Sequence, residues 1–317
     1  MRAVFSNISS NMFWFQWGCR IENTSVFSSF FKISFTKSDN LDLDSKNIDT
    51  SFSMLCRKPD NSIFLAQKSS CCSQRVIFFF LLLFLSAQIY SQGFNEQIYN
   101  AYISGNMEQW KEVMNEMQST IDLVKSEDLT YDLVIAQYGY IGFKINAGEK
   151  DEAKKYIRFI EDNLDFLENT YPDPAKIHAI RGAVQGYKVG LNAYKALFFG
   201  RKAFTENNVA MELSPDDPQV WMEKGNIELF KPEIFNPDSR EAAKIYSKSI
   251  RLYEADRANL KYNWLYLNTL INLATAHITS GDYAAANLVY EKLLKHEPAL
   301  KWVKDEVYPA FKRKHGF

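Results

Sequence analysis

No cysteine follows Cys72 in this chain of 317 residues, and all four cysteines (Cys19, Cys56, Cys71 and Cys72) fall in its first quarter. The absence excludes disulfides, cysteine-ligated metals and cysteine nucleophiles from residues 92–317. A domain without thiols suits either side of a membrane, so this absence does not assign a compartment.

The chain also lacks a net charge of either sign, because its formal charge is −1. A nearly neutral protein has no electrostatic footprint for nucleic acid, and none is expected as a partner. The balance is uneven along the chain. Residues 1–91 carry nine Lys and Arg against six Asp and Glu, whereas residues 92–317 carry 28 against 32. The two stretches therefore differ in the sign of their net charge.

Enzyme signatures are missing as well. The sequence contains no His-Glu-x-x-His motif, no Gly-rich phosphate loop after a strand and no Gly-x-Ser-x-Gly motif. Acidic pairs such as Glu127-Asp128 and Asp216-Asp217 fall at expected helix ends or turns, where solvated charge is the ordinary explanation. We therefore expect a protein that is not an enzyme, with no catalytic residue, no cofactor and no metal site.

One apolar run is present, from Val76 to Leu85. It has ten apolar residues, follows Arg75 and is succeeded by small and polar residues up to Ser91. This order is typical of a secretory signal peptide, here residues 75–91. The run is shorter than the roughly 20 residues that a spanning helix needs. We expect an exported protein, periplasmic or envelope-associated; the alternative is a protein anchored in the membrane through residues 76–90.

The signal peptide stands unusually far from Met1. Such segments normally occupy the first 30 or so residues. Residues 1–74 are rich in Ser, Asn and Phe and show no sustained period of 2 or 3.6. They are expected to be a disordered extension, or to follow from a start codon assigned too far upstream.

From residue 93 onward, helices follow one another. Apolar residues recur three and four positions apart, and β-type alternation is scarce. Gly and Pro interrupt the pattern at intervals, for example at Gly105, Gly148, Pro172 to Pro174 and Gly281. The breaks predict pairs of helices of 12 to 25 residues each.

The clearest unit runs from Leu267 to Pro298. Gly281 provides turn geometry that a Cβ would resist, and Ala274 and Ala286 allow two helices to pack closely. This unit resembles a tetratricopeptide repeat (TPR) over the full period of about 34 residues. The matching residues are Ala274, Gly281, Tyr283, Ala286, Tyr290 and Pro298.

A second unit supports the resemblance. Ala203 and Ala210 share one helix face, and Trp221 with Gly225 matches the large-then-small start of the next repeat. That repeat has an unusually long turn, Lys231 to Asp238, which is either a binding loop or a tolerated insertion. The resemblance covers about residues 93–298, strongly from 203 and loosely before it.

Two features depart from the repeat pattern. Trp110 stands where a small residue is usual in the first unit. Gly182, Gly186 and Gly190 recur every four residues in one helix, at a cost of about 3 kcal/mol in helix propensity. Close contact between helices is one explanation for the glycines; the other is a groove floor that a ligand chain approaches.

The resemblance implies an all-α, right-handed TPR superhelix of about five helix pairs, closed by a capping helix near Trp302 to Pro309. Residues 92–317 would form a non-catalytic protein–protein interaction scaffold that binds another protein or a peptide segment. A membrane would be contacted only through an uncleaved Val76–Leu85. The concave groove formed by the first helices would be lined by Lys188, Asn192, Lys195, Gln219, Met222, Asn226, Phe230, Asn268, Ile271 and Thr275.

Some TPR arrays clamp the C-terminal carboxylate of a partner. Lys188 and Asn192 match the first part of that clamp, but Glu223 stands where an Asn is needed and would repel the carboxylate. Carboxylate-tail binding is therefore not predicted. Two alternatives remain open: an envelope carbohydrate-binding or transport-associated protein with TPR helices as framework, and a helical enzyme with a close carboxylate pair in a pocket.

Overall fold

The structure is a computed structural model that describes residues 93–317. Within this range it contains eleven helical segments and no strand. The fold is all-α, as predicted, but the helix count exceeds the ten or so expected for about five pairs. The predicted extension 1–74, the signal peptide 75–91 and the apolar segment Val76–Leu85 lie outside the described residues.

Residues 93–104 are helical, and ten further helices follow. Their bounds are α2 Met107–Val124, α3 Glu127–Asn146, α4 Lys150–Leu167, α5 Pro174–Leu191, α6 Ala196–Leu213, α7 Pro218–Phe230, α8 Ser239–Ala255, α9 Trp264–Thr279, α10 Tyr283–His296 and α11 Tyr308–His315. Short 3₁₀ turns lie at Ala193–Lys195, Glu233–Phe235 and Arg257–Leu260, and a π-helical turn at Val303–Val307 precedes α11.

Side-chain caps start many of these helices. The Asp217 carboxylate accepts the backbone N–H groups of Gln219 and Val220, and Pro218 occupies the first turn, where its missing N–H is harmless. The glycines predicted to form turns have positive φ: 73° at Gly105, 79° at Gly148 and 82° at Gly281. These helix breaks are thus set locally by residues that the sequence shows.

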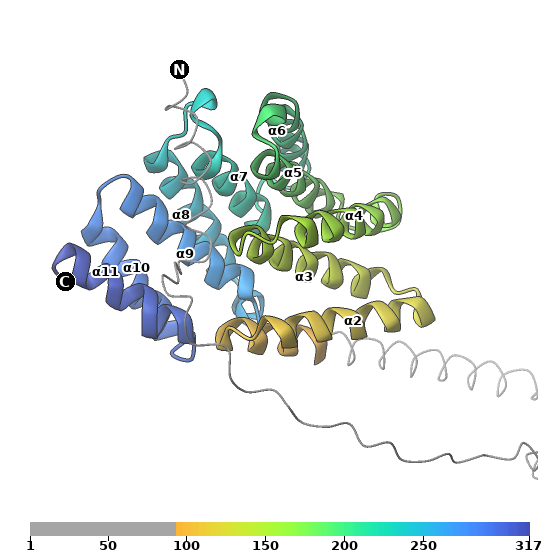
Figure 1. Cartoon of the computed structure of the whole chain (residues 1–317), viewed down its shortest axis with the longest axis horizontal. Helices are drawn as coiled ribbons and strands as arrows, with labels where there is room; N and C mark the ends of the chain where they lie inside the picture. Colours follow the sequence, from red (N-terminus) through yellow and green to blue (C-terminus); the bar gives the residue numbers. More distant parts are fainter. Residues whose placement is uncertain (1–92) are drawn as a thin grey trace, which may run out of the picture. The chain divides into compact units, whose positions relative to one another are not determined.

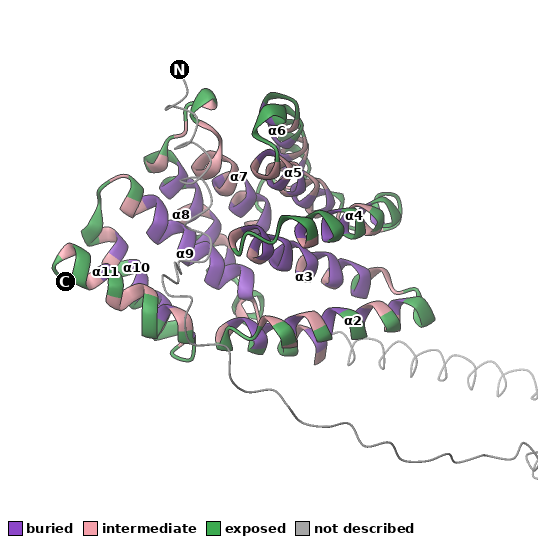
Figure 2. Ribbon diagram, in the orientation of Figure 1, coloured by how far each residue is buried: buried purple, intermediate pink, exposed green. Residues whose placement is uncertain are grey.

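Consecutive helices pack as pairs, α3 with α4, α5 with α6, α7 with α8 and α9 with α10. The first helices of successive pairs also meet one another, since α5 contacts both α3 and α7, and α7 contacts α9 (Figure 1). Two of these first helices, α3 and α9, are buried along most of their length (Figure 2). They form the interior against which the outer helices place one apolar face.

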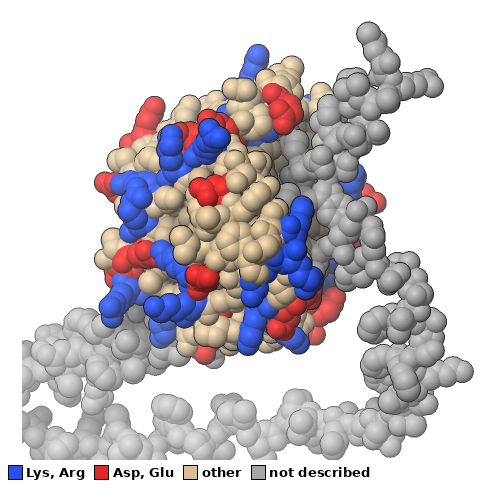
Figure 3. Space-filling model, turned by 90° about the vertical axis from the view of Figure 1, so that its left-hand side faces the viewer, with Lys and Arg blue, Asp and Glu red and all other residues tan. Residues whose placement is uncertain are grey.

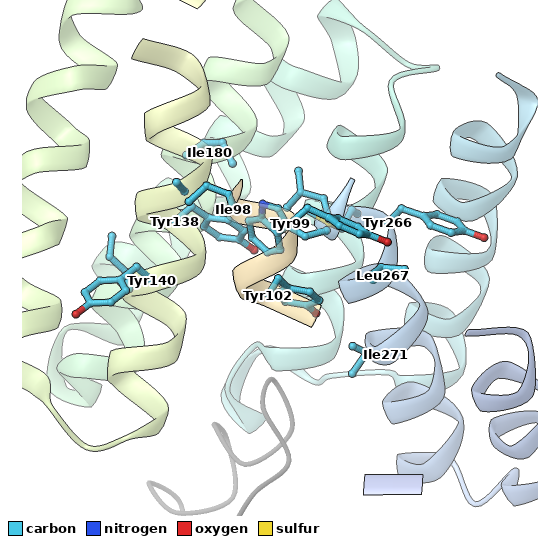
Figure 4. Packing of buried hydrophobic residues seen from close by; sticks show 14 of the residues in the cluster. Ile98, Tyr99, Tyr102, Tyr138, Tyr140, Ile180, Tyr266, Leu267 and Ile271 are labelled. Atoms are coloured by element: carbon cyan, nitrogen blue, oxygen red, sulfur yellow. The ribbon is translucent and has the colours of Figure 1, made fainter. Parts of the chain in front are cut away.

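The two ends of the described chain are in contact with each other. The Tyr99 hydroxyl donates a hydrogen bond to Glu297 Oε2 at 2.6 Å, although 198 positions separate these residues. Nearby, the rings of Trp110 and Trp264 pack edge to face, with centroids 5.2 Å apart. Figure 4 shows Tyr99 and Tyr102 in one cluster with residues of α3 and α9. An open stack of repeats has no such contact between its ends.

Trp110 is accommodated because its surroundings supply space. Its side chain is fully buried, and its indole N–H donates to the Ala136 carbonyl at 3.0 Å. A Cβ at position 139 would lie 2.8 Å from both Trp110 and Trp264. Because Gly139 has no Cβ, it leaves the space that the large Trp110 ring occupies.

The capping segment packs as an aromatic cluster. The Tyr290 ring lies 5.4 Å from that of Tyr308 and 5.3 Å from that of Phe311. These contacts cover α10 and confirm a helix in the region around 302–309. Among residues 93–317, none of the helices is both long and apolar enough to traverse a lipid bilayer.

Candidate binding pocket

A small pocket opens between α5, α6 and α7. Its volume is about 90 Å³. Most of its surface is apolar, and only a few of its lining residues have polar side chains. The lining consists of Tyr138, Gly182, Ala183, Gly186, Tyr187, Val189, Gly200, Ala203, Phe204, Glu223, Asn226, Ile227, Phe230, Lys231, Pro232 and Phe235.

Two of the three glycines of α5 have different roles here. A Cβ at Gly182 would lie 3.1 Å from the carbonyl oxygen of Ala203, so this glycine permits close contact between α5 and α6. A Cβ at Gly186 would meet no atom within 4 Å. Gly186 therefore leaves open space in the pocket wall, whereas close helix contact explains Gly182.

The long turn after α7 forms another wall. Phe235 lies against Gly200, where a Cβ would come within 2.9 Å of its ring, and packs edge to face on Phe204 at 5.6 Å. Lys231 and Pro232, at the start of the same turn, complete this side of the pocket. The long turn Lys231–Asp238 thus packs against α6 and contributes lining residues.

A hydrogen-bond network supports the polar end of the pocket, and Asn226 is its hub. Its Nδ2 donates to Glu223 Oε2 at 2.9 Å and to the Tyr138 hydroxyl at 3.2 Å. Its Oδ1 accepts from the Tyr246 hydroxyl at 2.7 Å and from Asn272 Nδ2 at 2.9 Å. Both hydrogens and both lone pairs of the amide are used, so its orientation is fixed.

Glu223 is the one carboxylate in the lining. Its side chain is buried, at 1% exposure, and its Oε1 has no hydrogen-bond partner within the described chain. Burial raises the pKa of Glu223 to about 7, against weaker lowering by hydrogen bonds with Asn226 and Tyr138. The carboxyl group thus changes charge near neutral pH in a place where water does not compensate it.

The residues predicted for the groove are dispersed. Asn226 and Phe230 line the pocket. Lys188 is half-buried near the end of α5, where it pairs with Glu161, and Asn192 and Lys195 are exposed beyond that helix. The other five are buried in the interior and present almost no surface to solvent: Gln219, Met222, Asn268, Ile271 and Thr275.

Several lining residues were not singled out from the sequence. Gly200, Phe204 and Phe235 meet only because the turn after α7 folds back on α6, a contact without a local sequence signature. Glu223 was noted only as a misfit in a carboxylate clamp. That misfit, an acidic residue on an apolar helix face, was the available signal for the site.

Within residues 93–317 no cluster of three or more His, Cys, Asp or Glu residues is placed to hold a metal ion. Positive and negative side chains are interspersed on the face drawn in Figure 3, which covers one side of the molecule. That face offers no extended field of one sign to steer a highly charged partner.

Comparison with known proteins gives little. No protein-family model matches the chain. No curated protein matches it either. Among solved structures, the HusA haemophore from Porphyromonas gingivalis is similar, with 17% sequence identity and a TM-score of 0.48, over 58% of this chain and 92% of that chain. Neither a family nor a ligand follows from a similarity of this size.

Proposed function

We propose that this chain is a non-catalytic TPR-type binding protein that captures a segment of a partner protein by anchoring one side chain in the α5–α7 pocket. The carrying observation is the pocket itself: it is apolar, opened at Gly186 and walled by partly exposed Phe204, Phe230 and Phe235. In keeping with the sequence, we propose that the protein acts in the cell envelope after export.

The size of the pocket favours an anchor over a free ligand. Pockets that enclose drug-sized molecules measure about 300–1,000 Å³, and an engineered cavity of about 150 Å³ holds a benzene ring. A volume of about 90 Å³ fits one amino-acid side chain. Tyr194, Leu197 and Phe198, which precede Gly200 in the chain, are more than half exposed and would contact the rest of the segment.

The other candidate functions have less support. A sugar ring needs a donor or acceptor for each hydroxyl group, whereas this lining is mostly apolar. A carboxylate pair for acid–base chemistry would need a second acidic residue beside Glu223, and the lining holds one. The one ammonium, Lys231, is paired with Glu228 at 2.7 Å.

Selection of random displayed peptides on the full chain tests the proposal, with Gly186→Leu as the matched variant. A Cβ at this position meets no atom within 4 Å, so we expect leucine to fill the pocket while the fold is kept. We expect the wild type to enrich peptides that share one anchor position and Gly186→Leu to lose them. The same peptides enriched on both proteins, or none enriched on the wild type, would contradict the proposal.

A further inference from the structure

The pocket specifies more than an apolar anchor, because one oxygen of its buried carboxylate has no partner. Glu223 is hydrogen-bonded by Asn226 and Tyr138, and its Oε1 is still left without a partner within the described chain. A buried, unpaired carboxylate oxygen is costly and is normally matched by a donor or a cation. Within the described chain, neither a donor nor a cation pairs with this oxygen.

The residues that line the pocket indicate which chemical group could pair with Glu223 Oε1. Next to the carboxylate, the rings of Tyr138 and Tyr187 are stacked with centroids 5.4 Å apart, and both line the pocket. Aromatic faces attract cations. The remaining wall, including Ala183 and Ile227, is aliphatic and suits a hydrocarbon stem. An occupant with an apolar stem and a cationic tip fits both parts.

We infer that the anchor is a primary alkylammonium group, as a lysine side chain presents, whose nitrogen pairs with Glu223 Oε1. This inference rests on the proposed function and names the residue that the partner inserts. Glu223 is itself a lining residue, so such a pair would form at the pocket wall.

An arginine is the obvious competitor, and the geometry disfavours it. The guanidinium fork gains its advantage by bonding both oxygens of a carboxylate at once. Here Oε2 is occupied by Asn226, so a single oxygen is available. A compact ammonium pairs with a single oxygen without giving up a second hydrogen bond. Its four methylene groups also fit the narrow pocket better than a planar guanidinium does.

Binding depends on the charge of Glu223. The groups that face it are the hydroxyls of Tyr138 on α3 and of Tyr246 and Tyr253 on α8, and burial raises the pKa of all three so that they stay neutral near pH 7. Lys231 at the rim is balanced by Glu228. Because burial raises the pKa of Glu223 to about 7, a bound ammonium displaces a proton below that pH.

The test is calorimetric titration of the full chain with n-butylammonium, the analogue of the lysine side chain, and with neutral 1-butanol. At pH 8 we expect the amine to bind at least tenfold more tightly than the alcohol, and its affinity to fall about tenfold at pH 6. Glu223→Gln should abolish the difference between the two probes and still bind 1-butanol.

The outcomes separate the two proposals. If 1-butanol binds as tightly as the amine and Gly186→Leu blocks both, the pocket is an apolar anchor site and the lysine assignment is wrong. If neither probe binds, and peptide selection is indifferent to Gly186→Leu, both proposals fall. In enriched peptides, replacing the anchor lysine by norleucine, which keeps the stem without the charge, should weaken binding at least tenfold.

Discussion

Gly225 of α7 faces the ring of Tyr246 of α8 with no room for a methyl group between them. A Cβ at position 225 would lie 2.6 Å from Cε1 of the tyrosine. Tyr246 is fully buried, and its hydroxyl holds Asn226, the hub of the pocket network. The small residue thus sets the spacing of two helices and the position of the polar cluster behind the pocket.

Gly225→Ala should destabilise the protein strongly, by about 2–3 kcal/mol, because the ring cannot retreat within a packed core. The measurement is denaturant unfolding followed by circular dichroism. Anchored-peptide binding should weaken together with stability, since Tyr246 positions Asn226. An unchanged unfolding midpoint would show that the ring moves aside freely.

Gly182 and Gly186 of α5 offer a matched comparison on one helix. Gly186→Ala should stabilise the fold by up to about 1 kcal/mol, because alanine is the better helix former and its methyl group meets no atom. Gly182→Ala gains the same propensity but presses on the Ala203 carbonyl oxygen, so it should be destabilising. Thermal unfolding of the two variants measures the difference; equal shifts would contradict this account of α5.

Replacement of Glu223 should raise stability in a pH-dependent way. The unfolded chain ionises this group near its ordinary pKa of 4.5, and burial raises the folded pKa to about 7. The folded state therefore holds the extra proton between these values, and stability falls as pH rises from 4.5 to 7. Glu223→Gln, which keeps an acceptor for Asn226, should gain about 3 kcal/mol at pH 8 and little at pH 4.

The gain from Glu223→Gln is checked by unfolding both proteins at the two pH values. A stabilised variant that also loses ammonium binding would show a carboxylate retained for binding at the expense of stability. A destabilised variant at pH 8 would contradict the burial argument, since it would mean that the ionised form has a compensating partner.

Acid should weaken an ion cluster that lies where α3 ends and α4 begins. Glu152 pairs with Lys111 of α2 at 2.8 Å and with Lys144 of α3 at 3.2 Å. Its hydrogen bond with Lys111 is the main reason that its pKa is lowered to about 2, and Lys144 lowers it further. The stabilisation is complete above pH 4.5 and is lost as pH falls toward 2.

Glu152→Gln should therefore cost about 1 kcal/mol at pH 7, and the difference from wild type should vanish near pH 2. Asp151→Asn is the control, because Asp151 is almost fully exposed and pairs only with Lys154 three residues on. Its effect should stay within about 0.5 kcal/mol at every pH. Urea unfolding across the pH range compares the two variants.

Most of the structural features that the sequence predicts correctly depend on single residues and their near neighbours. Gly105, Gly148 and Gly281 were assigned to turns because only glycine adopts positive φ without strain, and the structure has them so. Gly225 was matched to the small position at the start of a repeat, and in the structure a Cβ there would clash with the Tyr246 ring. Such features depend on a residue and its near neighbours, which a sequence displays directly.

The pocket and the contact between the ends could not be foreseen in the same way. The groove residues were chosen for an open concave surface, but Met222, Asn268 and Ile271 are enclosed by other helices. Tyr99 and Glu297 have no pattern in the sequence that joins them. Contacts over such separations depend on the summed curvature of all the intervening helices, to which every turn contributes.

The bond between Tyr99 and Glu297 also constrains how this protein could have changed in length. A solenoid with two free ends can lengthen by duplicating a hairpin, because the new copy meets only its neighbours. Here an inserted hairpin would move the end of α10 away from Tyr99 and break the hydrogen bond between Tyr99 and Glu297. Contact between the two ends therefore opposes a change in the number of helix hairpins, and substitutions within the existing helices disturb this contact less.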